Sequence, residues 1–225
     1  MKPMTDEHFA MLRRHMVEVI AMHADLMEGE IGKPTLDARV MEAVLRVPRH
    51  LFVPQQLARL AYGDTPLPIG FDKTISQPFI VALMTDLLSP QPHESVLEVG
   101  TGLGYQTAIL AELARSVRSV EIVEEFVAVA EARLLELGYA AVSIRVGDGS
   151  RGWAEHAPFD KILVAAAADR IPSALITQLK PGGCLVLPLG SNEGQRLTVV
   201  KRDAEGRISV QESIPVRFTR LETVT

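Results

Sequence analysis

The sequence predicts an α/β fold: a doubly wound, mostly parallel sheet with an N-terminal helical cap and a C-terminal antiparallel hairpin. From Ser95 onward, short β-rich runs alternate with helical patterns, which is the order of a parallel sheet with helices on both faces. The stretch before this alternation is broken by prolines and glycines. The last two β-rich runs are joined by the short segment Asp203–Gly206, which is typical of a hairpin at the edge of such a sheet.

The N-terminal part, residues 1–92, is expected to form the helical cap and a substrate-loop region that pack on the core as one compact unit. Apolar residues at helical spacing predict a helix over Phe9–Met27. A second helix is expected over Thr35–Arg46, with Thr35 as its N-cap and Pro48 beyond its end.

Proline and glycine divide residues 48–78 into turns and short pieces, and a long irregular stretch in a compact domain is often functional. A helix is expected over Phe79–Leu88, and the core over residues 93–225. The expected strands of the core are Ser95–Val99, Val117–Glu121, Val142–Val146, Lys161–Ala165, Cys184–Pro188, Leu197–Lys201 and Ile208–Ile214, and its expected helices are Gln106–Ala114, Glu124–Gly138 and Ala174–Leu179.

The composition is that of a globular protein with an acidic balance. Of the 225 residues, 47% are hydrophobic and 23% are charged, which excludes wholesale disorder. The net charge of −5 argues against a generally basic surface for nucleic acid or an anionic membrane. The longest aliphatic run, Ile162–Ala168, is far shorter than the roughly 20 residues of a membrane helix. With no secretory signal pattern either, we expect a cytoplasmic protein, and a monomer by default.

Cysteine and histidine offer little chemistry in this chain. The single cysteine, Cys184, excludes an intramolecular disulfide and is expected to be a buried small hydrophobe in a central strand. The six histidines show no metal-binding spacing, so no metal site is expected. For His50 we expect a structural hydrogen bond.

The strongest local signal is a glycine-rich segment, residues 98–104, between a predicted strand and a predicted helix. Glycines there allow a tight turn and a close approach to a ligand, and the helix N-terminus offers N–H donors. Glu121 ends the next predicted strand, 21 positions after Gly100. A carboxylate at about this offset accepts hydrogen bonds from the ribose hydroxyls of an adenosine cofactor.

The same loop favours S-adenosylmethionine over a dinucleotide. The dinucleotide fingerprint has its third glycine where this chain has Tyr105, and here the extra glycine comes one position early, at Gly104. The carboxylate of Glu98 would repel a pyrophosphate and favour a cation, and S-adenosylmethionine carries a sulfonium and an ammonium. On the loop alone, a glycine turn that only packs strand against helix is the alternative, and Glu121 shifts the balance toward cofactor binding.

Two weaker signals complete the candidate site. Asp148, which follows a predicted strand in Gly147-Asp148-Gly149, is suited to accept a hydrogen bond from an adenine amino group, although Asp-Gly turns are common. Thr74 and Ser76 carry hydroxyls, but no Ser-His-Asp set is visible nearby. From the residues alone, capping of the following helix explains Thr74 and Ser76 better than catalysis does.

The motifs, taken in order, resemble the protein-L-isoaspartate O-methyltransferase family over residues 46–190. The glycine loop is common to methyltransferases, whereas the first two of the following segments are much more specific. The matching segments are Val47-Pro48-Arg49-His50-Leu51-Phe52-Val53-Pro54, Thr74-Ile75-Ser76-Gln77-Pro78, Ala61-Tyr62, Pro66-Leu67-Pro68-Ile69-Gly70, Leu97-Glu98-Val99-Gly100-Thr101-Gly102, Gly147-Asp148-Gly149, Ala157-Pro158-Phe159-Asp160 and Gln178-Leu179-Lys180-Pro181-Gly182-Gly183.

The resemblance implies the fold of a class I S-adenosylmethionine-dependent methyltransferase and a reaction. That reaction is methyl transfer from S-adenosylmethionine to the free α-carboxylate of an L-isoaspartyl residue in a damaged protein or peptide, which starts its repair. It implies Ser76 as the active-site residue, with Gln77 and Phe79 beside it on the substrate. The implied cofactor contacts are Thr74, Ile75, Ser76, Gly100, Thr101, Gly102, Glu121, Asp148 and Gly149.

The chain departs from the family pattern in two places. Phe71-Asp72-Lys73 stands where bacterial members usually have a Gln-Gly-Gln-type triplet, and Thr219-Arg220 replaces the Val-Pro of the C-terminal pattern. These departures keep open a carboxyl methyltransferase dedicated to an aspartate in one peptide or natural-product precursor. A non-catalytic S-adenosylmethionine-binding protein is a further alternative, and a dehydrogenase is the weakest one.

Overall fold

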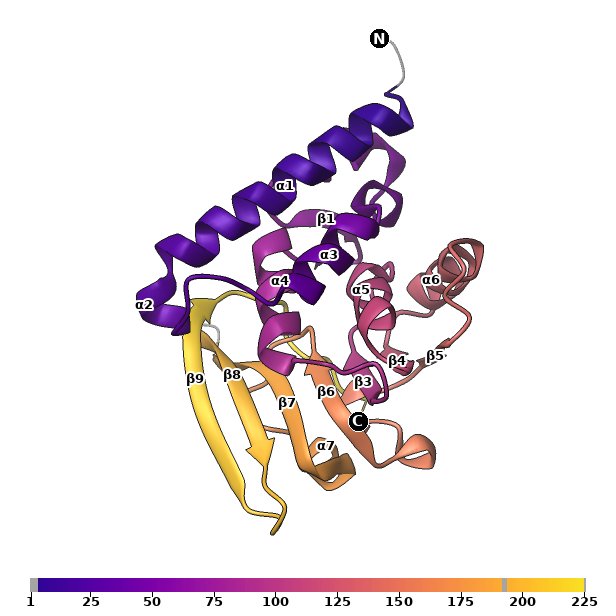
Figure 1. The fold of residues 1–225 in the computed structure, drawn as a ribbon. Coiled ribbons are helices and arrows are strands. Elements are labelled where there is room, and N and C mark those ends of the chain that lie inside the picture. The colour runs from indigo at the N-terminus through magenta and orange to yellow at the C-terminus, as the bar shows by residue number, and fades with distance from the viewer. Residues whose placement is uncertain (1–3, 192–193, 225) are drawn as a thin grey trace. The chain divides into compact units, whose positions relative to one another are not determined.

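The chain divides into two compact units, Met1–Asp86 and Leu87–Thr225, in the computed structural model (Figure 1). The structure describes residues 4–191 and 194–224. The boundary between the two units falls inside helix α4 (Pro78–Leu88).

The first unit begins with the long helix α1 (Asp6–Leu26), followed by α2 (Glu28–Ile31) and α3 (Ala38–Arg46). Helix α1 starts earlier than its apolar pattern predicts because Thr5 and His8 form a capping box ahead of that pattern. The predicted N-cap Thr35 is wrong: Asp37 caps α3 by accepting from the Arg39 N–H. The buried faces of α1 and α3 are formed by Met16, Ile20, Ala24, Val40, Ala43 and Val44.

The irregular stretch holds short elements, as predicted. They are the 3₁₀ helices η1 (Arg49–Phe52) and η2 (Gln55–Leu60) and the antiparallel strands β1 (Leu67–Gly70) and β2 (Lys73–Ile75). Between β1 and β2, Phe71 and Asp72 have φ of 50° and 54°. Such left-handed pairs favour Asn-Gly, so Phe71 holds a conformation that costs about 1 kcal/mol.

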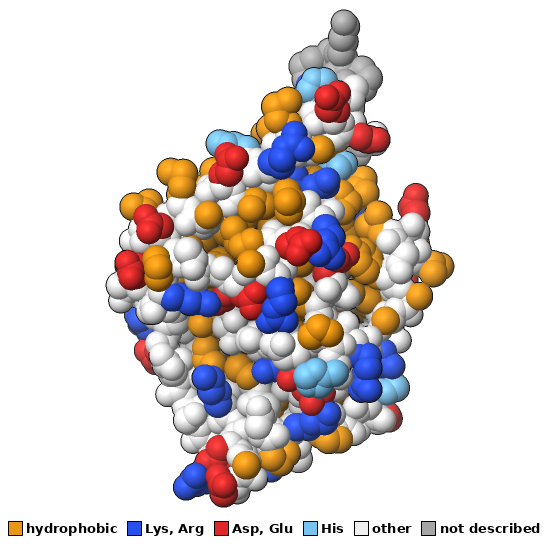
Figure 2. Space-filling model, in the orientation of Figure 1, with side chains coloured by type: hydrophobic (Ala, Val, Ile, Leu, Met, Phe, Trp, Pro, Cys, Tyr) orange, Lys and Arg blue, Asp and Glu red, His pale blue; other side chains and the backbone are white. Residues whose placement is uncertain are grey.

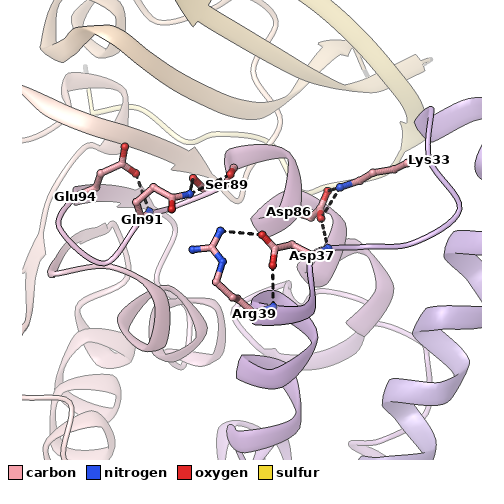
Figure 3. A network of polar contacts seen from close by, with 7 residues as sticks. All are labelled: Lys33, Asp37, Arg39, Asp86, Ser89, Gln91 and Glu94. Carbon is pink, nitrogen blue, oxygen red and sulfur yellow. Dashed lines mark hydrogen bonds and ion pairs between the residues drawn. The ribbon is translucent and has the colours of Figure 1, made fainter.

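A buried carboxylate, Asp86 near the end of α4, ties down the segment that enters α3 (Figure 3). Lys33 Nζ donates to Asp86 Oδ1 at 2.7 Å and lies 2.6 Å from Oδ2. The backbone N–H of Asp37 also donates to Asp86 Oδ1, at 2.7 Å. This contact fixes the chain at the residue where α3 starts, and it explains why Asp37 rather than Thr35 is the cap.

We expect Asp86→Ala to lower the free energy of unfolding by about 2 kcal/mol, because it leaves a partly buried N–H and a partly buried ammonium without their acceptor. Urea denaturation measures the change. The matched control is Glu42→Ala, which removes an exposed carboxylate paired with Arg46 and should cost less than about 0.5 kcal/mol. Equal effects of the two substitutions would contradict the assigned role of Asp86.

The second unit is built on a seven-stranded sheet of order β5-β4-β3-β6-β7-β8-β9. The five strands from β5 to β7 are parallel, and β7, β8 and β9 form an antiparallel meander at one edge. The mostly parallel sheet and the C-terminal hairpin are therefore confirmed. The strands are β3 (Ser95–Val99), β4 (Ser116–Glu121), β5 (Val142–Val146), β6 (Phe159–Val164), β7 (Leu179–Ser191), β8 (Gly194–Arg202) and β9 (Ile208–Val216).

Helices α5 (Tyr105–Leu113) and α6 (Glu124–Glu136) connect strands in one direction across the sheet, from β3 to β5. Helix α7 (Ser173–Gln178) connects β6 to β7 in the opposite direction. Because such crossovers are right-handed, α7 covers the face opposite to α5 and α6. Gly138, with φ of 86°, follows the end of α6, as predicted for a helix stop.

The core of this unit is apolar and nearly closed to solvent. Its buried cluster comprises Leu97, Val99, Val120, Phe159, Ile162, Val164, Ala166, Ala168, Leu175, Leu179, Leu185, Leu187 and Val200. Strand β7 is much longer than its predicted span, because Leu179 pairs with Phe159 before the register shifts to the pair Lys161 and Cys184. Cys184 is buried, as predicted, and burial raises the pKa of its thiol.

On the face drawn in Figure 2, acidic and basic side chains are interspersed. Among the residues that the structure describes, no helix is long and apolar enough to cross a membrane.

Candidate functional site

Three predicted site segments lie together at the carboxyl ends of the parallel strands in the second unit. The glycine loop follows β3, Glu121 ends β4, and Asp148-Gly149 follows β5. The chain runs from β3 to β4 and β5 on one side and returns to β6 on the other, so the loop after β3 lies where the strand order reverses. Open α/β sheets bind their ligands at such a point, outside the carboxyl ends of the strands.

The glycine loop is held in its shape by a carboxylate of the neighbouring strand. Gly100 and Gly102 have φ of 91° and 54°, which other residues adopt only with strain. The Gly102 N–H donates to Glu121 Oε2 at 2.8 Å. The other oxygen, Oε1, accepts from the N–H groups of Ile122 and Val123 at 2.8 and 3.0 Å. Glu121 thus links β4 to the loop, and its carboxylate offers acceptors at the place where a ribose would need them.

Glu98 lies beneath the loop rather than on its surface. Its side chain is fully buried, and Oε2 accepts from the hydroxyls of Thr107 and Ser119 at 2.5 and 2.6 Å. The hydroxyl of Thr101, a predicted cofactor contact, is 2.6 Å from that of Ser119 and is buried. Among the residues that the structure describes, none forms a hydrogen bond with Glu98 Oε1. The Glu98 carboxylate would therefore attract a cation bound at the loop by long-range electrostatics rather than by direct contact.

Burial raises the pKa of Glu98 from 4.5 to about 7. The hydrogen bonds from Ser119 and Thr107 oppose this shift, and the nearby Glu121 carboxylate adds to it.

Asp148 is already engaged by its own loop and by the C-terminal segment. Oδ1 accepts from the N–H and hydroxyl of Ser150 at 2.9 and 2.7 Å, and Oδ2 accepts from the Val224 N–H at 3.1 Å. Burial alone would raise the pKa of Asp148, but these hydrogen bonds and the charge of Arg151 outweigh burial and lower the pKa. Gly149 is needed for packing, since a Cβ there would lie 2.2 Å from Val99 Cγ1.

In the first unit, Ser76 stands between β2 and α4, on a backbone held by a buried arginine. Arg49 is fully buried. Its Nη2 donates to the Ser76 carbonyl and its Nε donates to the Ala61 carbonyl, both at 2.8 Å. Thr74 is exposed on β2, Ile75 is buried, and Ser76 is half-buried. The family-specific segment around Arg49 therefore positions the segment that contains Ser76.

Asp64 organises the residues on the other side of Ser76. Its carboxylate accepts from the Phe79 N–H at 2.8 Å and from the Gln77 amide at 2.9 Å, and it lies 2.7 Å from His23 Nδ1. Asp64 thus satisfies the Phe79 N–H, one of the N–H groups at the start of α4 that have no partner within the helix. Phe79 itself is buried, with the His23 ring against its edge.

Sequence reasoning assigned no role to Arg49, Asp64, Thr107 or Ser119. The position of Arg49 inside a family-specific motif was the available signal. His50 has the structural role that was expected: its Nδ1 lies 2.7 Å from the Tyr62 hydroxyl, and its ring stacks on Phe9 at 3.8 Å.

The acceptors and glycines of the second unit fit an adenosine ligand. A ribose diol and an adenine amino group both donate hydrogen bonds, and the carboxylates of Glu121 and Asp148 stand at the ends of adjacent strands. The positive-φ glycines allow the backbone to approach such a ligand closely.

Comparisons with known proteins point to one family. Residues 21–224 match the family model for protein-L-isoaspartate(D-aspartate) O-methyltransferase. A protein-L-isoaspartate O-methyltransferase 1 of a Polaromonas species is 54% identical over 97% of this chain and 93% of its own.

Two solved structures share the fold. One, a protein-L-isoaspartate O-methyltransferase, is 25% identical with a TM-score of 0.78; the alignment covers 92% of this chain, which spans 65% of that structure's length. The other is a Plasmodium falciparum protein of the same description in complex with S-adenosyl-L-homocysteine. It has a TM-score of 0.78 at 22% identity, over 94% of this chain and 99% of its own.

Proposed function

The chain belongs to the protein-L-isoaspartate(D-aspartate) O-methyltransferase family, and we propose that it methylates the free α-carboxylate of L-isoaspartyl residues in damaged proteins and peptides. The methyl donor is S-adenosylmethionine, and the ester formed starts repair. The observation that carries this proposal is the match of residues 21–224 to the family, because that span includes both the Ser76 segment and the strand ends of the second unit.

The second unit is suited to hold the cofactor. Glu121 would accept from the ribose hydroxyls, Asp148 would accept from the adenine amino group, and Gly100 and Gly102 would let the loop backbone approach the cofactor. Asp148 Oδ2 can accept from the adenine amino group if its hydrogen bond from the Val224 N–H breaks. When bound, S-adenosylmethionine supplies a methyl group on a strongly electrophilic sulfonium.

Ser76 is proposed to bind the substrate carboxylate rather than to act as a covalent nucleophile. A carboxylic acid with a pKa of roughly 3.5–4 is ionised at about pH 7, so no general base is required. The task of the protein is to desolvate and orient this anion, and positioning of that kind can lower a barrier by roughly 7–11 kcal/mol at best. The Ser76 hydroxyl donates to the carboxylate, on a backbone that Arg49 keeps in place.

The first experiment compares two synthetic peptides of one sequence, one with L-isoaspartate and one with L-aspartate. Each is incubated with the protein and S-adenosylmethionine, and mass spectrometry follows the gain of one methyl group. Methylation confined to the isoaspartyl peptide supports the proposal. Equal methylation of both peptides would instead favour the dedicated aspartate carboxyl methyltransferase, and cofactor binding without any turnover would favour a binding-only role.

We expect Ser76→Ala to lower kcat/KM for the isoaspartyl peptide by about 10- to 100-fold, the size of one lost hydrogen bond to a charged group. The Kd for S-adenosylmethionine should change much less. Ser209→Ala, on the exposed face of β9, is the matched control and should leave both quantities unchanged. Full activity of Ser76→Ala would remove Ser76 from the reaction.

The dedicated enzyme is kept as a second candidate because of the strained turn at Phe71 and Asp72, which departs from the family pattern. We further propose that the protein works as a cytoplasmic monomer, which its lone buried cysteine permits.

A further inference from the structure

A cavity of about 860 Å³ lies in the second unit, beyond the ends of β5 and β6. Its walls are the segment after Asp148-Gly149, the loop 167–174 that follows β6, and the C-terminal residues Arg220, Leu221 and Thr223. The cavity therefore opens at the carboxyl ends of the strands, as the glycine loop does. Open α/β sheets bind their ligands at these ends.

The charge of this cavity differs from that of the chain as a whole. Three arginines, Arg151, Arg170 and Arg220, line it, against the carboxylate of Asp169 in the same wall. A second carboxylate stands behind Arg151, because Asp148 Oδ2 lies 3.4 Å from its Nε, and the described residues leave an excess of one positive charge. The protein carries a net charge of −5, so a wall with an excess of positive charge is a local feature. We call it the arginine cavity. The Arg151 and Arg220 side chains are 71% and 38% exposed, so both remain accessible to a solute.

The backbone holds Arg220 firmly at the rim. The Ala167 N–H donates to the Thr219 carbonyl and the Leu221 N–H donates to the Ala167 carbonyl, both at 2.8 Å. The residue between these two bonds is Arg220, whose guanidinium pairs with Asp169. The hydrogen bond from Arg220 keeps the pKa of the Asp169 carboxyl below the ordinary value of an aspartate, so the ion pair of Arg220 and Asp169 stays charged. A guanidinium has five N–H donors, and one carboxylate does not use them all.

We propose that the arginine cavity receives an acidic side chain next to the isoaspartyl residue of the substrate, and that Arg220 determines this specificity. The inference rests on the proposed function. It gives a physical reason for the departure at Arg220, where a proline would supply neither charge nor donor.

The test uses three isoaspartyl peptides that differ at one flanking position, with Glu, Gln or Lys, and that have blocked termini so that the side chain is the only difference. The series is repeated at each flanking position in turn. At the flanking position with the largest difference, we expect the kcat/KM of the wild-type protein for the Glu peptide to be about fivefold above that for the Gln peptide. The kcat/KM for the Lys peptide should be lower than that for the Gln peptide. The preference should shrink when salt is raised to about 1 M.

Arg220→Gln should abolish this preference while leaving the KM for S-adenosylmethionine unchanged, and Asp169→Asn, which releases the guanidinium, should increase it. The matched control is Arg115→Gln, which should keep the preference. Arg115 is exposed and lies just before β4, at the amino-terminal end of the strand and thus away from the cavity. Equal rates for the Glu and Gln peptides at every position, or an Arg220→Gln variant with intact preference, would overturn the inference and leave the proposed function standing. Failure of the protein to methylate any isoaspartyl peptide would overturn both.

Discussion

Replacing Glu121 with Ala is expected to raise the Kd for S-adenosylmethionine by about 10²- to 10⁴-fold. Two hydrogen bonds from ribose hydroxyls to one carboxylate are worth roughly 1.5–3 kcal/mol each, and the substitution removes both. It also releases the Gly102 N–H, which Glu121 Oε2 holds at 2.8 Å, so the glycine loop loses the contact that ties it to β4.

Isothermal titration calorimetry with S-adenosylmethionine and S-adenosylhomocysteine measures this effect, and both ligands should weaken together because they share the ribose. Glu125→Ala, an exposed acidic residue in the first turn of α6, removes the same charge and serves as the control. Circular dichroism must show that the Glu121 variant is folded at the titration temperature. A folded variant that binds within about threefold of the wild-type protein would refute the role of Glu121 in holding the ribose.

Glu121 also shows why part of this site was predictable from the sequence. Its offset from Gly100 follows from the length of one strand–helix–strand unit, and the repeated alternation fixes which residues end the strands. The same local rules placed β3, β5 and the C-terminal hairpin. Local rules do not predict the N-cap of α3, because Thr35 and Asp37 are both good capping residues. Asp37 takes this position because its N–H donates to Asp86, which lies far along the chain.

The supports of Ser76 could not be predicted for the same reason. Arg49 reaches the Ser76 carbonyl across 27 positions, and Asp64 reaches the Phe79 N–H across 15. No periodicity or spacing rule links such residues, since these contacts exist only once the chain between them has folded. The burial of Glu98 was likewise outside local reasoning, because its neighbours come from α5 and β4.

Glu98 makes the stability of the protein depend on pH in a direction that can be worked out. Burial raises its pKa from 4.5 to about 7 in the folded chain, so between these values the folded protein holds a proton that the unfolded chain releases. The stabilisation from this proton is complete below about pH 4.5 and is lost as the pH rises to about 7. A shift of this size corresponds to about 3 kcal/mol.

Glu98→Gln cannot ionise, yet its amide oxygen can still accept from Thr107 and Ser119. We therefore expect the unfolding free energy of this variant, minus that of the wild-type protein, to rise by about 3 kcal/mol between about pH 4.5 and pH 8. Urea denaturation at several pH values measures the difference, which cancels all titrations that the two proteins share. Glu125→Gln, whose side chain is exposed, should give a difference independent of pH. A flat difference for Glu98→Gln as well would mean that Glu98 ionises in the folded protein as it does in the unfolded chain, and that water reaches it beneath the loop.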